Sequence, residues 1–219
     1  MPDLYKDKWN QLHKEFSENP KNIMKYDDWL DEFKDIIDNV NSEIIDLGCG
    51  VTGNNTLYLL ERNKKVLSCD FAEEALNVIR KHIPSSKTIC FDMTESFPFS
   101  DNVTELIIAD LSIHYFSQEI TKNIIKEIKR VLKSNGYLIF RVNSTNSTEY
   151  KKLQKKSEER IEDKFFFFKG IQKRFFDEND LKKFFEDWDI EYLKEGNMNR
   201  WSEDKIVWKC VVRNIKNNI

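Results

Sequence analysis

The sequence predicts an α/β fold in which helices cover both faces of a parallel sheet. Between residues 43 and 142, short apolar runs alternate with amphipathic segments, the pattern of successive strand–helix–strand units. The run at residues 106–109 is wholly apolar, as expected of a strand buried on both faces. Four of these runs are also followed or closed by an aspartate, and ligands bind at the carboxyl ends of the strands in such sheets.

Two amphipathic segments precede this alternating region. Apolar residues from Leu4 to Phe16 recur at near-helical spacing, and a second stripe with a period near 3.6 covers residues 23–37. We expect residues 1–40 to form an N-terminal helical cap on a domain that spans residues 41–219.

The alternating region predicts five strands and three intervening helices. The strands are expected at residues 43–47, 66–70, 88–91, 105–109 and 137–142, and the helices at residues 54–62, 73–83 and 118–133. Ser117 is a suitable N-cap for the third helix, and Asn135-Gly136 is expected to stop it.

The alternation ends after residue 143. Residues 144–176 are polar and charge-rich until a phenylalanine-rich stretch, in which Lys169-Gly170 predicts a hairpin turn. We expect this segment to be an inserted lid. Asp177 is placed to cap a further helix, and final strands are predicted at residues 190–193 and 206–212.

Composition limits the classes of function. The chain has 219 residues, 40% of them hydrophobic and 33% charged, with a net charge of −3. These values exclude a disordered, collagenous or membrane-bundle protein and predict neither a nucleic-acid nor a membrane partner. The first residues do not resemble a secretory signal, so a cytoplasmic location is expected. The four cysteines form no CxxC pair and are predicted to be reduced core residues rather than metal ligands.

The candidate site lies at the predicted strand ends. Its acids are Asp46, Asp70, Asp92 and Asp110. Packing explains none of them, because a carboxylate at a strand end contributes nothing to a core. Gly48 and Gly50 allow a sharp turn and the close approach of a ligand to the backbone.

The order of these residues suggests an adenosine ligand. Asp70 follows Asp46 at about the interval from which an acid binds both ribose hydroxyls of an adenosine. Asp92, after the next strand, is placed to accept a hydrogen bond from an exocyclic amine of the base.

Five segments then resemble the successive motifs of class I S-adenosylmethionine-dependent methyltransferases, most closely the small-molecule enzymes of the tellurite-resistance and general methyltransferase-domain type. The segments are EIIDLGCGVTGNN, VLSCDFAEEAL, TICFDMTESFPFSDN, LIIADLSIHYFS and EIKRVLKSNGYLIF. The resemblance implies a Rossmann-like, seven-stranded, mostly parallel sheet of order 3-2-1-4-5-7-6 with strand 7 antiparallel. It also implies S-adenosyl-L-methionine as cofactor, S-adenosyl-L-homocysteine as product and a small-molecule acceptor.

The resemblance assigns roles residue by residue. The methionine part of the cofactor would be met by Asp46, Gly48, Cys49 and Gly50. The adenosine would be met by Asp70 at the ribose and by Phe71, Asp92 and Met93 at the adenine. Asp110 and Leu111 would flank the sulfonium. One departure concerns the loop: the family's third glycine would stand at Thr52, and Gly53 follows instead.

Two other functions remain open at this level. Gly48, Gly50 and Gly53 match the G-x-G-x-x-G fingerprint of dinucleotide-dependent oxidoreductases. Against this ligand stand Asp46, which would face a charged pyrophosphate, and the acid Asp92 after the third strand. A non-catalytic domain that binds the cofactor as a sensor or scaffold is the other alternative.

Candidates for catalysis and acceptor binding are few. His114, Tyr115 and Asp110 follow the fourth strand, and His114 is the possible general base if the acceptor carries a proton. Tyr5 and Trp9 of the first helix are expected to line the acceptor site, and the phenylalanine-rich hairpin is a second candidate lining. The sequence assigns neither the acceptor nor the oligomeric state.

Overall fold

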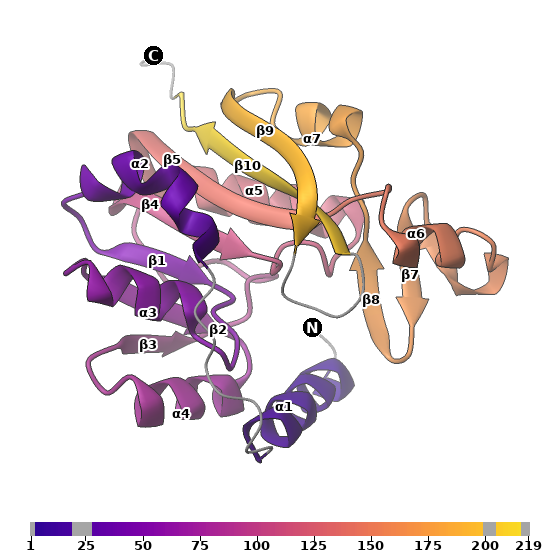
Figure 1. Ribbon diagram of the computed structural model, residues 1–219, viewed down its shortest axis with the longest axis horizontal. Coiled ribbons are helices and arrows are strands. Elements are labelled where there is room, and N and C mark those ends of the chain that lie inside the picture. Colours follow the sequence, from indigo (N-terminus) through magenta and orange to yellow (C-terminus); the bar gives the residue numbers. More distant parts are fainter. Residues whose placement is uncertain (1–2, 19–27, 199–204, 216–219) are drawn as a thin grey trace.

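The computed structural model describes residues 3–18, 28–198 and 205–215. Its centre is a seven-stranded sheet of order β3-β2-β1-β4-β5-β10-β9 (Figure 1). The strands are β1 (Ile44–Leu47), β2 (Val66–Asp70), β3 (Lys87–Cys90), β4 (Thr104–Asp110), β5 (Leu132–Asn143), β9 (Asp189–Met198) and β10 (Lys205–Arg213). β1 to β5 pair in parallel, and β10 is antiparallel to both of its neighbours. This confirms the predicted fold class and strand order.

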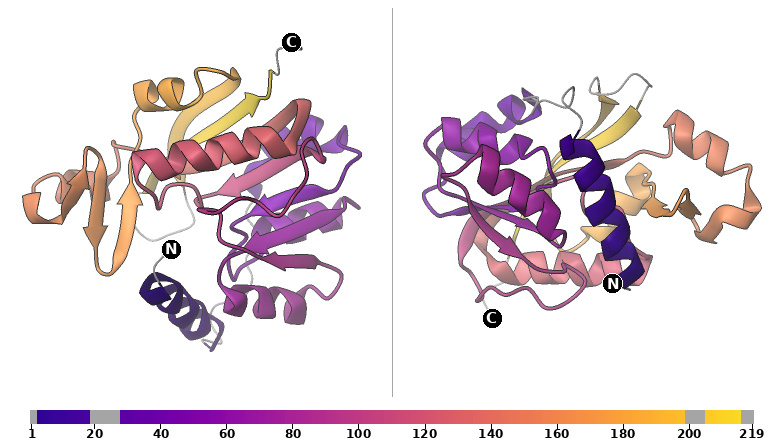
Figure 2. Two further views of the ribbon diagram at one scale, coloured as in Figure 1. Left: turned by 180° about the vertical axis from the view of Figure 1, so that it is seen from behind. Right: turned by 90° about the horizontal axis from the view of Figure 1, so that it is seen from below.

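Helices cover both faces of the sheet (Figure 2). One face carries η1 (Asp28–Phe33), α2 (Lys34–Asp38) and α3 (Asn54–Glu61), with α4 (Glu73–His82) packed beside α3. The other face carries α5 (Gln118–Val131) and α7 (Glu178–Phe184). Strands buried on both sides explain why their sequences are almost entirely apolar.

Local sequence explains where the helices of the second face begin. The Ser117 hydroxyl accepts a hydrogen bond from the Ile120 amide at the start of α5, as its position predicts. Asp177 and Asp180 form a reciprocal capping box at the start of α7. Together these caps orient two helices on the face opposite η1.

The segment before the sheet differs from the predicted helix at residues 23–37. Residues 19–27 lie outside the described part of the chain, and the next six form a 3-10 helix followed by the short α2. Leu30 and Phe33 are three residues apart and both buried, which suits the three-residue turn of a 3-10 helix. Residues 28–40 therefore belong to the core on one face of the sheet, whereas α1 (Asp3–Glu18) packs on α4.

Two further expectations need correction, and one strand is additional. The predicted helix at residues 118–133 ends at Val131, and the chain enters β5 before Asn135, which turns with φ +63°. Cys90 is exposed because it lies on the edge strand β3, whereas the other three cysteines are buried; all four are free. The chain around residue 160 adds a strand that the sequence did not suggest.

The insertion forms a small subdomain beside the sheet. It contains α6 (Thr148–Leu153), the single turn η2 (Ser157–Glu159) and a second sheet of β6 (Arg160–Glu162), β7 (Phe165–Phe168) and β8 (Ile171–Arg174). The β7–β8 hairpin turns at Lys169-Gly170 as predicted, with both residues in the left-handed region. Within the described ranges, no helix combines the length and apolar character needed to cross a membrane.

Candidate functional site

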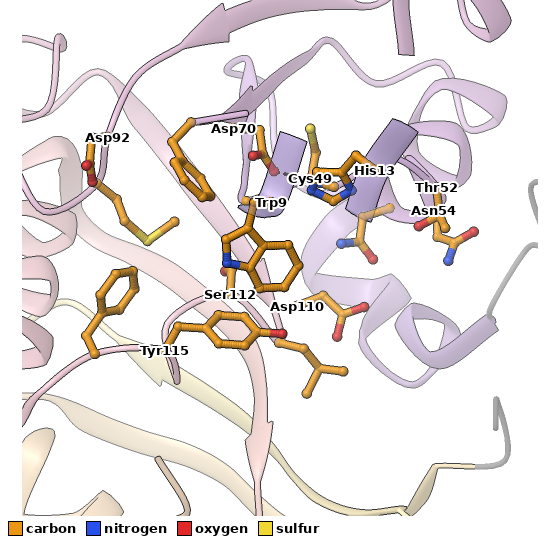
Figure 3. Close-up of a pocket in the computed structure, with 17 residues that line it drawn as sticks. Trp9, His13, Cys49, Thr52, Asn54, Asp70, Asp92, Asp110, Ser112 and Tyr115 are labelled. Atoms are coloured by element: carbon orange, nitrogen blue, oxygen red, sulfur yellow. Dashed lines mark hydrogen bonds between the residues drawn. The ribbon is translucent and has the colours of Figure 1, made fainter. Parts of the chain in front are cut away.

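A pocket opens at the carboxyl ends of β1, β2 and β4, beneath α1 (Figure 3). It holds about 890 Å³ of empty space, its open mouth included. Its lining comprises Trp9, His13, Gly48, Cys49, Gly50, Thr52, Asn54, Asn55, Asp70, Phe71, Asp92, Met93, Asp110, Leu111, Ser112, Tyr115 and Phe116. The pocket therefore brings together nearly all of the predicted cofactor residues.

The glycine turn after β1 is held against the end of β2. The amides of Gly48 and Cys49 both donate to the carbonyl of Cys69, and the amide of Gly50 donates to Asp70 Oδ2 at 2.9 Å. Gly48 has φ +74°, and a Cβ there would lie 2.3 Å from the Cβ of Ser112. A Cβ on Gly50 would instead meet no atom within 4 Å. The turn thus presents bare backbone to the pocket.

Asp70 is the most enclosed acid of the lining. Its Oδ1 accepts from the amide of Ala72 at 3.0 Å, and the Phe71 amide is a third backbone donor to this carboxylate. A carboxylate has about four acceptor sites, so Asp70 retains capacity for a further donor. Burial raises the pKa of Asp70, and the neighbouring His13 opposes this rise. His13 comes from α1, one helical turn after Trp9. The first helix therefore supplies a titratable partner to the central carboxylate of the pocket.

The third strand end carries Asp92 and Met93. Asp92 Oδ1 accepts from both the amide and the hydroxyl of Thr94, at 2.9 and 2.8 Å. Met93 is buried, and Phe71 also lines the pocket. An acid beside two apolar side chains can bind a planar base by its edge and its faces.

The fourth strand end carries a buried ion pair. Arg141 donates from Nε and Nη2 to the two carboxylate oxygens of Asp110, each at 2.7 Å. Both side chains are under a tenth exposed. The next residue, Leu111, has φ +55°, and its amide donates to the carbonyl of Arg141. A non-glycine residue in this region stores strain, a feature common at functional sites.

Asp46 does not line the pocket. It is fully buried below it, where Oδ1 accepts from Asn55 Nδ2 at 3.1 Å and Oδ2 from the Thr56 hydroxyl at 2.8 Å. Burial raises the pKa of Asp46 to about 6, although these hydrogen bonds act to lower it. Asp46 thus ties β1 to the first turn of α3, and a contact with the cofactor stays a prediction.

The residues predicted for catalysis and acceptor binding separate in the structure. Tyr115 lines the pocket and packs edge-on against Trp9, with ring centroids 5.0 Å apart. His114 lies outside the lining, and burial, with Lys205 and Lys173, lowers its pKa well below the usual range. Such a ring is neutral at pH 7 and is only a weak base, so its catalytic role stays a prediction. The side chain of Tyr5 lies outside the described residues.

The phenylalanine-rich hairpin does not reach the pocket lining. Phe165 and Phe166 are buried, and Phe166 packs with Tyr150 and Phe175 inside the insertion. These aromatic residues stabilise the subdomain rather than the site.

The sequence missed several lining residues. They are His13, Thr52, Asn54, Asn55, Ser112 and Phe116. His13 could have been found from its spacing, because residues four apart share a helix face and Trp9 was already a candidate.

The charge of the lining distinguishes between ligand classes. Asp70, Asp92 and Asp110 contribute carboxylates, of which Asp110 is paired with Arg141 from outside the lining, and the described lining contains no lysine or arginine. A dinucleotide would place its pyrophosphate among these acids, whereas a cation with hydroxyl and amino groups would find acceptors. The residues present therefore fit an adenosyl sulfonium.

Comparison with known proteins agrees with this chemistry. Residues 45–140 match the family model described as a methyltransferase domain. The chain carries a methyltransferase domain of the class I fold. S-adenosylmethionine is the cofactor that such a domain uses.

Solved structures share the methyltransferase fold. A SAM-dependent methyltransferase from Methanosarcina mazei has a TM-score of 0.72 at 19% identity, covering 81% of this chain and 94% of that one. TehB from Haemophilus influenzae has a TM-score of 0.60 at 20% identity, covering 86% and 66%.

Curated relatives match a smaller share of this chain than the solved structures do. A tRNA N(3)-methylcytidine methyltransferase of Schizosaccharomyces pombe is 28% identical over an alignment of 155 positions that covers 62% of this chain and 58% of the relative. An uncharacterised methyltransferase-like protein of the same yeast is 32% identical over 112 residues, 51% and 41% of the two chains. This chain thus spans little more than half of the first relative, and the tRNA substrate of that relative leaves the expected absence of a nucleic-acid partner without support.

Proposed function

We propose that the protein transfers a methyl group from S-adenosylmethionine to a small-molecule acceptor. The observation that carries the proposal is a pocket of three carboxylates and a bare glycine turn at successive strand ends, with no lysine or arginine in its described lining. The methyltransferase-domain match supports the same conclusion independently.

The geometry suggests how this chain would hold the cofactor. Asp70 retains acceptor capacity for the ribose beside its backbone donors Gly50, Phe71 and Ala72. Phe71 and Met93 offer apolar contacts for the adenine, and Asp92 an acceptor for its amine. The backbone of Cys49 and Gly50 would run along the methionine part.

The bound cofactor supplies a methyl group already activated by a sulfonium. The chain then has to hold the acceptor in line with it and to exclude water, and such positioning is worth about 7–11 kcal/mol of barrier. Trp9 of α1 and Tyr115 both line the pocket and are in edge-to-face contact. Because α1 lies across the strand ends, these two rings are suited to hold the acceptor and to exclude water. Because His114 is neutral, it can help only weakly to remove a proton from the acceptor. We therefore favour an acceptor atom that needs little help from a general base.

A small acceptor is favoured over RNA by the overall charge of −3 and by the α1 side chains that narrow the pocket. The tRNA-modifying relative is the specific observation that favours the second candidate, methylation of an RNA base.

Thermal shift and calorimetry test cofactor binding. Saturation at about 100 times the dissociation constant adds about 2.7 kcal/mol of stability, which should raise the melting temperature by ~5–10 °C. S-adenosylmethionine and S-adenosylhomocysteine should produce this rise and NAD should not. Asp70→Ala should remove it, while Asp35→Asn, a fully exposed surface control, should keep it. A shift with NAD alone would overturn the proposal.

Transfer of labelled methyl then tests the acceptor. A panel of thiols, amines, phenols and carboxylic acids is compared with bulk tRNA. Label in a small molecule supports the proposal, whereas label in tRNA alone establishes the second candidate. Cofactor binding without turnover on either panel would support a non-catalytic sensor or scaffold.

A further inference from the structure

A group of polar side chains adjoins the pocket on the side of β4, β5 and β10, and only Asp110 among them is assigned to the cofactor. We call it the polar cluster, and it consists of Asp110, His114, Arg141, Asn143, Lys173 and Lys205. Only Asp110 among them also lines the pocket. The cluster is therefore continuous with the end of the pocket at which a sulfonium is expected.

Strand register brings the cluster together. Asp110 pairs with Arg141, and Asn143 lies two residues further along β5 on the same face. Asn143 pairs with Val207 of β10, and Lys205 lies two residues before Val207, again on that face. The side chains of residues 141, 143 and 205 thus leave one face of the sheet at its carboxyl edge.

The insertion closes the other side of the cluster. The Ser144 amide donates to the carbonyl of Ile206 and Ser144 bridges to Phe176, so the chain leaving β8 lies beside the start of β10 (Figure 1). The amide of Arg174 donates to the carbonyl of His114. Lys173 of β8 is thereby held near His114 and Lys205, and both lysines act electrostatically on that histidine.

One cation of the polar cluster has no ion-pair partner among the described residues. Arg141 is matched by Asp110, and Lys173 by Glu149 of α6 at 2.6 Å. Lys205 makes no hydrogen bond or ion pair with any described residue, although it is partly buried. Burial and the charge of Lys173 lower the pKa of Lys205 to about 8, and the charges of Asp110 and Glu149 only partly offset this lowering.

Two buried polar atoms nearby also have no hydrogen-bond partner among the described residues. They are Nδ2 of Asn143, which is 2% exposed, and Nδ1 of His114, which is 1% exposed. An unsatisfied buried donor costs about 1–3 kcal/mol in general, so such groups are rare unless something else binds them. An unmatched ammonium beside an unmatched amide N–H is a suitable site for an anion.

We infer that the acceptor carries an anionic group, a carboxylate or a phosphate, that Lys205 and Asn143 bind beside Asp110. This inference rests on the proposed function and adds a substrate class to it. The anion would face the cation left unmatched by the two ion pairs. It would also orient the rest of the acceptor toward the pocket, where Trp9, Tyr115 and Phe116 suit an apolar or aromatic body.

Matched probes test the anion site in protein saturated with S-adenosylhomocysteine. Benzoate and phenyl phosphate are titrated beside benzamide, which has the same ring without the charge, and binding is followed by calorimetry and by the NMR shifts of labelled lysine. We expect benzoate or phenyl phosphate to bind better than benzamide and to raise the pKa of Lys205. The two acids distinguish a carboxylate from a phosphate.

Variants assign the binding to this lysine. Lys205→Gln should weaken the preferred acid about tenfold or more, the effect of losing one charge-assisted hydrogen bond, without changing benzamide. Lys205→Arg should retain most of the affinity. Lys209→Gln is the matched control, because Lys209 lies on the same strand but pairs with Glu32.

The outcomes separate the two proposals. Failure of the wild-type protein to bind S-adenosylhomocysteine would overturn the proposed function. Two results would overturn the anion site alone, provided that S-adenosylhomocysteine still binds. One is equal affinity for benzoate, phenyl phosphate and benzamide, and the other is no effect of Lys205→Gln on binding of the acids. Binding of an RNA oligonucleotide that depends on Lys205, with neither small acid bound, would overturn it in favour of an RNA phosphate.

Discussion

Asp46 offers a quantitative test of how the floor of the site is built. Its carboxylate is fully buried, and burial raises its pKa from the ordinary 3.8 to about 6. The folded state therefore binds the Asp46 proton more tightly than the unfolded chain does. Stability from this group is fully present below pH 4 and is lost as the pH rises toward and through 6.

The size of the effect follows from the shift. The difference between 3.8 and about 6 corresponds to about 3 kcal/mol of unfolding free energy at pH 7.5. In Asp46→Asn the amide oxygen can still accept from Asn55. The Thr56 hydroxyl can turn toward Ser68, which lies 2.7 Å away, and accept from the new amide group. The substitution therefore removes the charge with little loss of hydrogen bonding.

We expect Asp46→Asn to become more stable relative to wild type as the pH rises. Urea unfolding of both proteins between pH 4.5 and 7.5 should show the difference in unfolding free energy growing by about 2 kcal/mol. Because other titrating groups are common to both proteins, their contributions cancel. A difference that stays constant over this range would show that Asp46 ionises normally, and the account of its burial would fail.

Three further substitutions test the strand ends by urea unfolding. Gly48→Ala should lower the unfolding free energy by about 3 kcal/mol, because the backbone is left-handed and the new Cβ would lie 2.3 Å from Ser112. Gly196→Ala is the control and should be nearly neutral, because a Cβ there meets nothing within 4 Å. Equal losses in the two variants would contradict the steric argument. Arg141→Met leaves a buried carboxylate unpaired and should cost about 3–5 kcal/mol, and a loss below 1 kcal/mol would show that this ion pair is not needed. Leu111→Gly relieves a left-handed backbone and should change stability by no more than about 1 kcal/mol, so a loss of 2 kcal/mol or more would argue against strain there.

Much of the pocket lining could be predicted from sequence. Gly48, Gly50, Asp70 and Asp92 stand at strand ends, and parallel strands bring their carboxyl ends to one edge whatever the distant packing. The hairpin turn at Lys169-Gly170 was likewise predictable, because a two-residue turn with positive φ is a local property.

Tertiary structure alone decided which way the side chains face and what they meet. Asp46 and Asp70 both end strands, yet one is bonded beneath the pocket by α3 and the other lines it, a difference set by the neighbouring helix. His114 lies outside the lining, where its carbonyl accepts from the Arg174 amide of β8, and Lys205 has no ion-pair partner among the described residues. Sequence by itself determined the alternation of strands and helices and the row of acids, because periodicity and turn chemistry are local; the strand order followed only from the family resemblance. Burial and charge balance depend on elements far apart in the chain, and only the folded structure determines them.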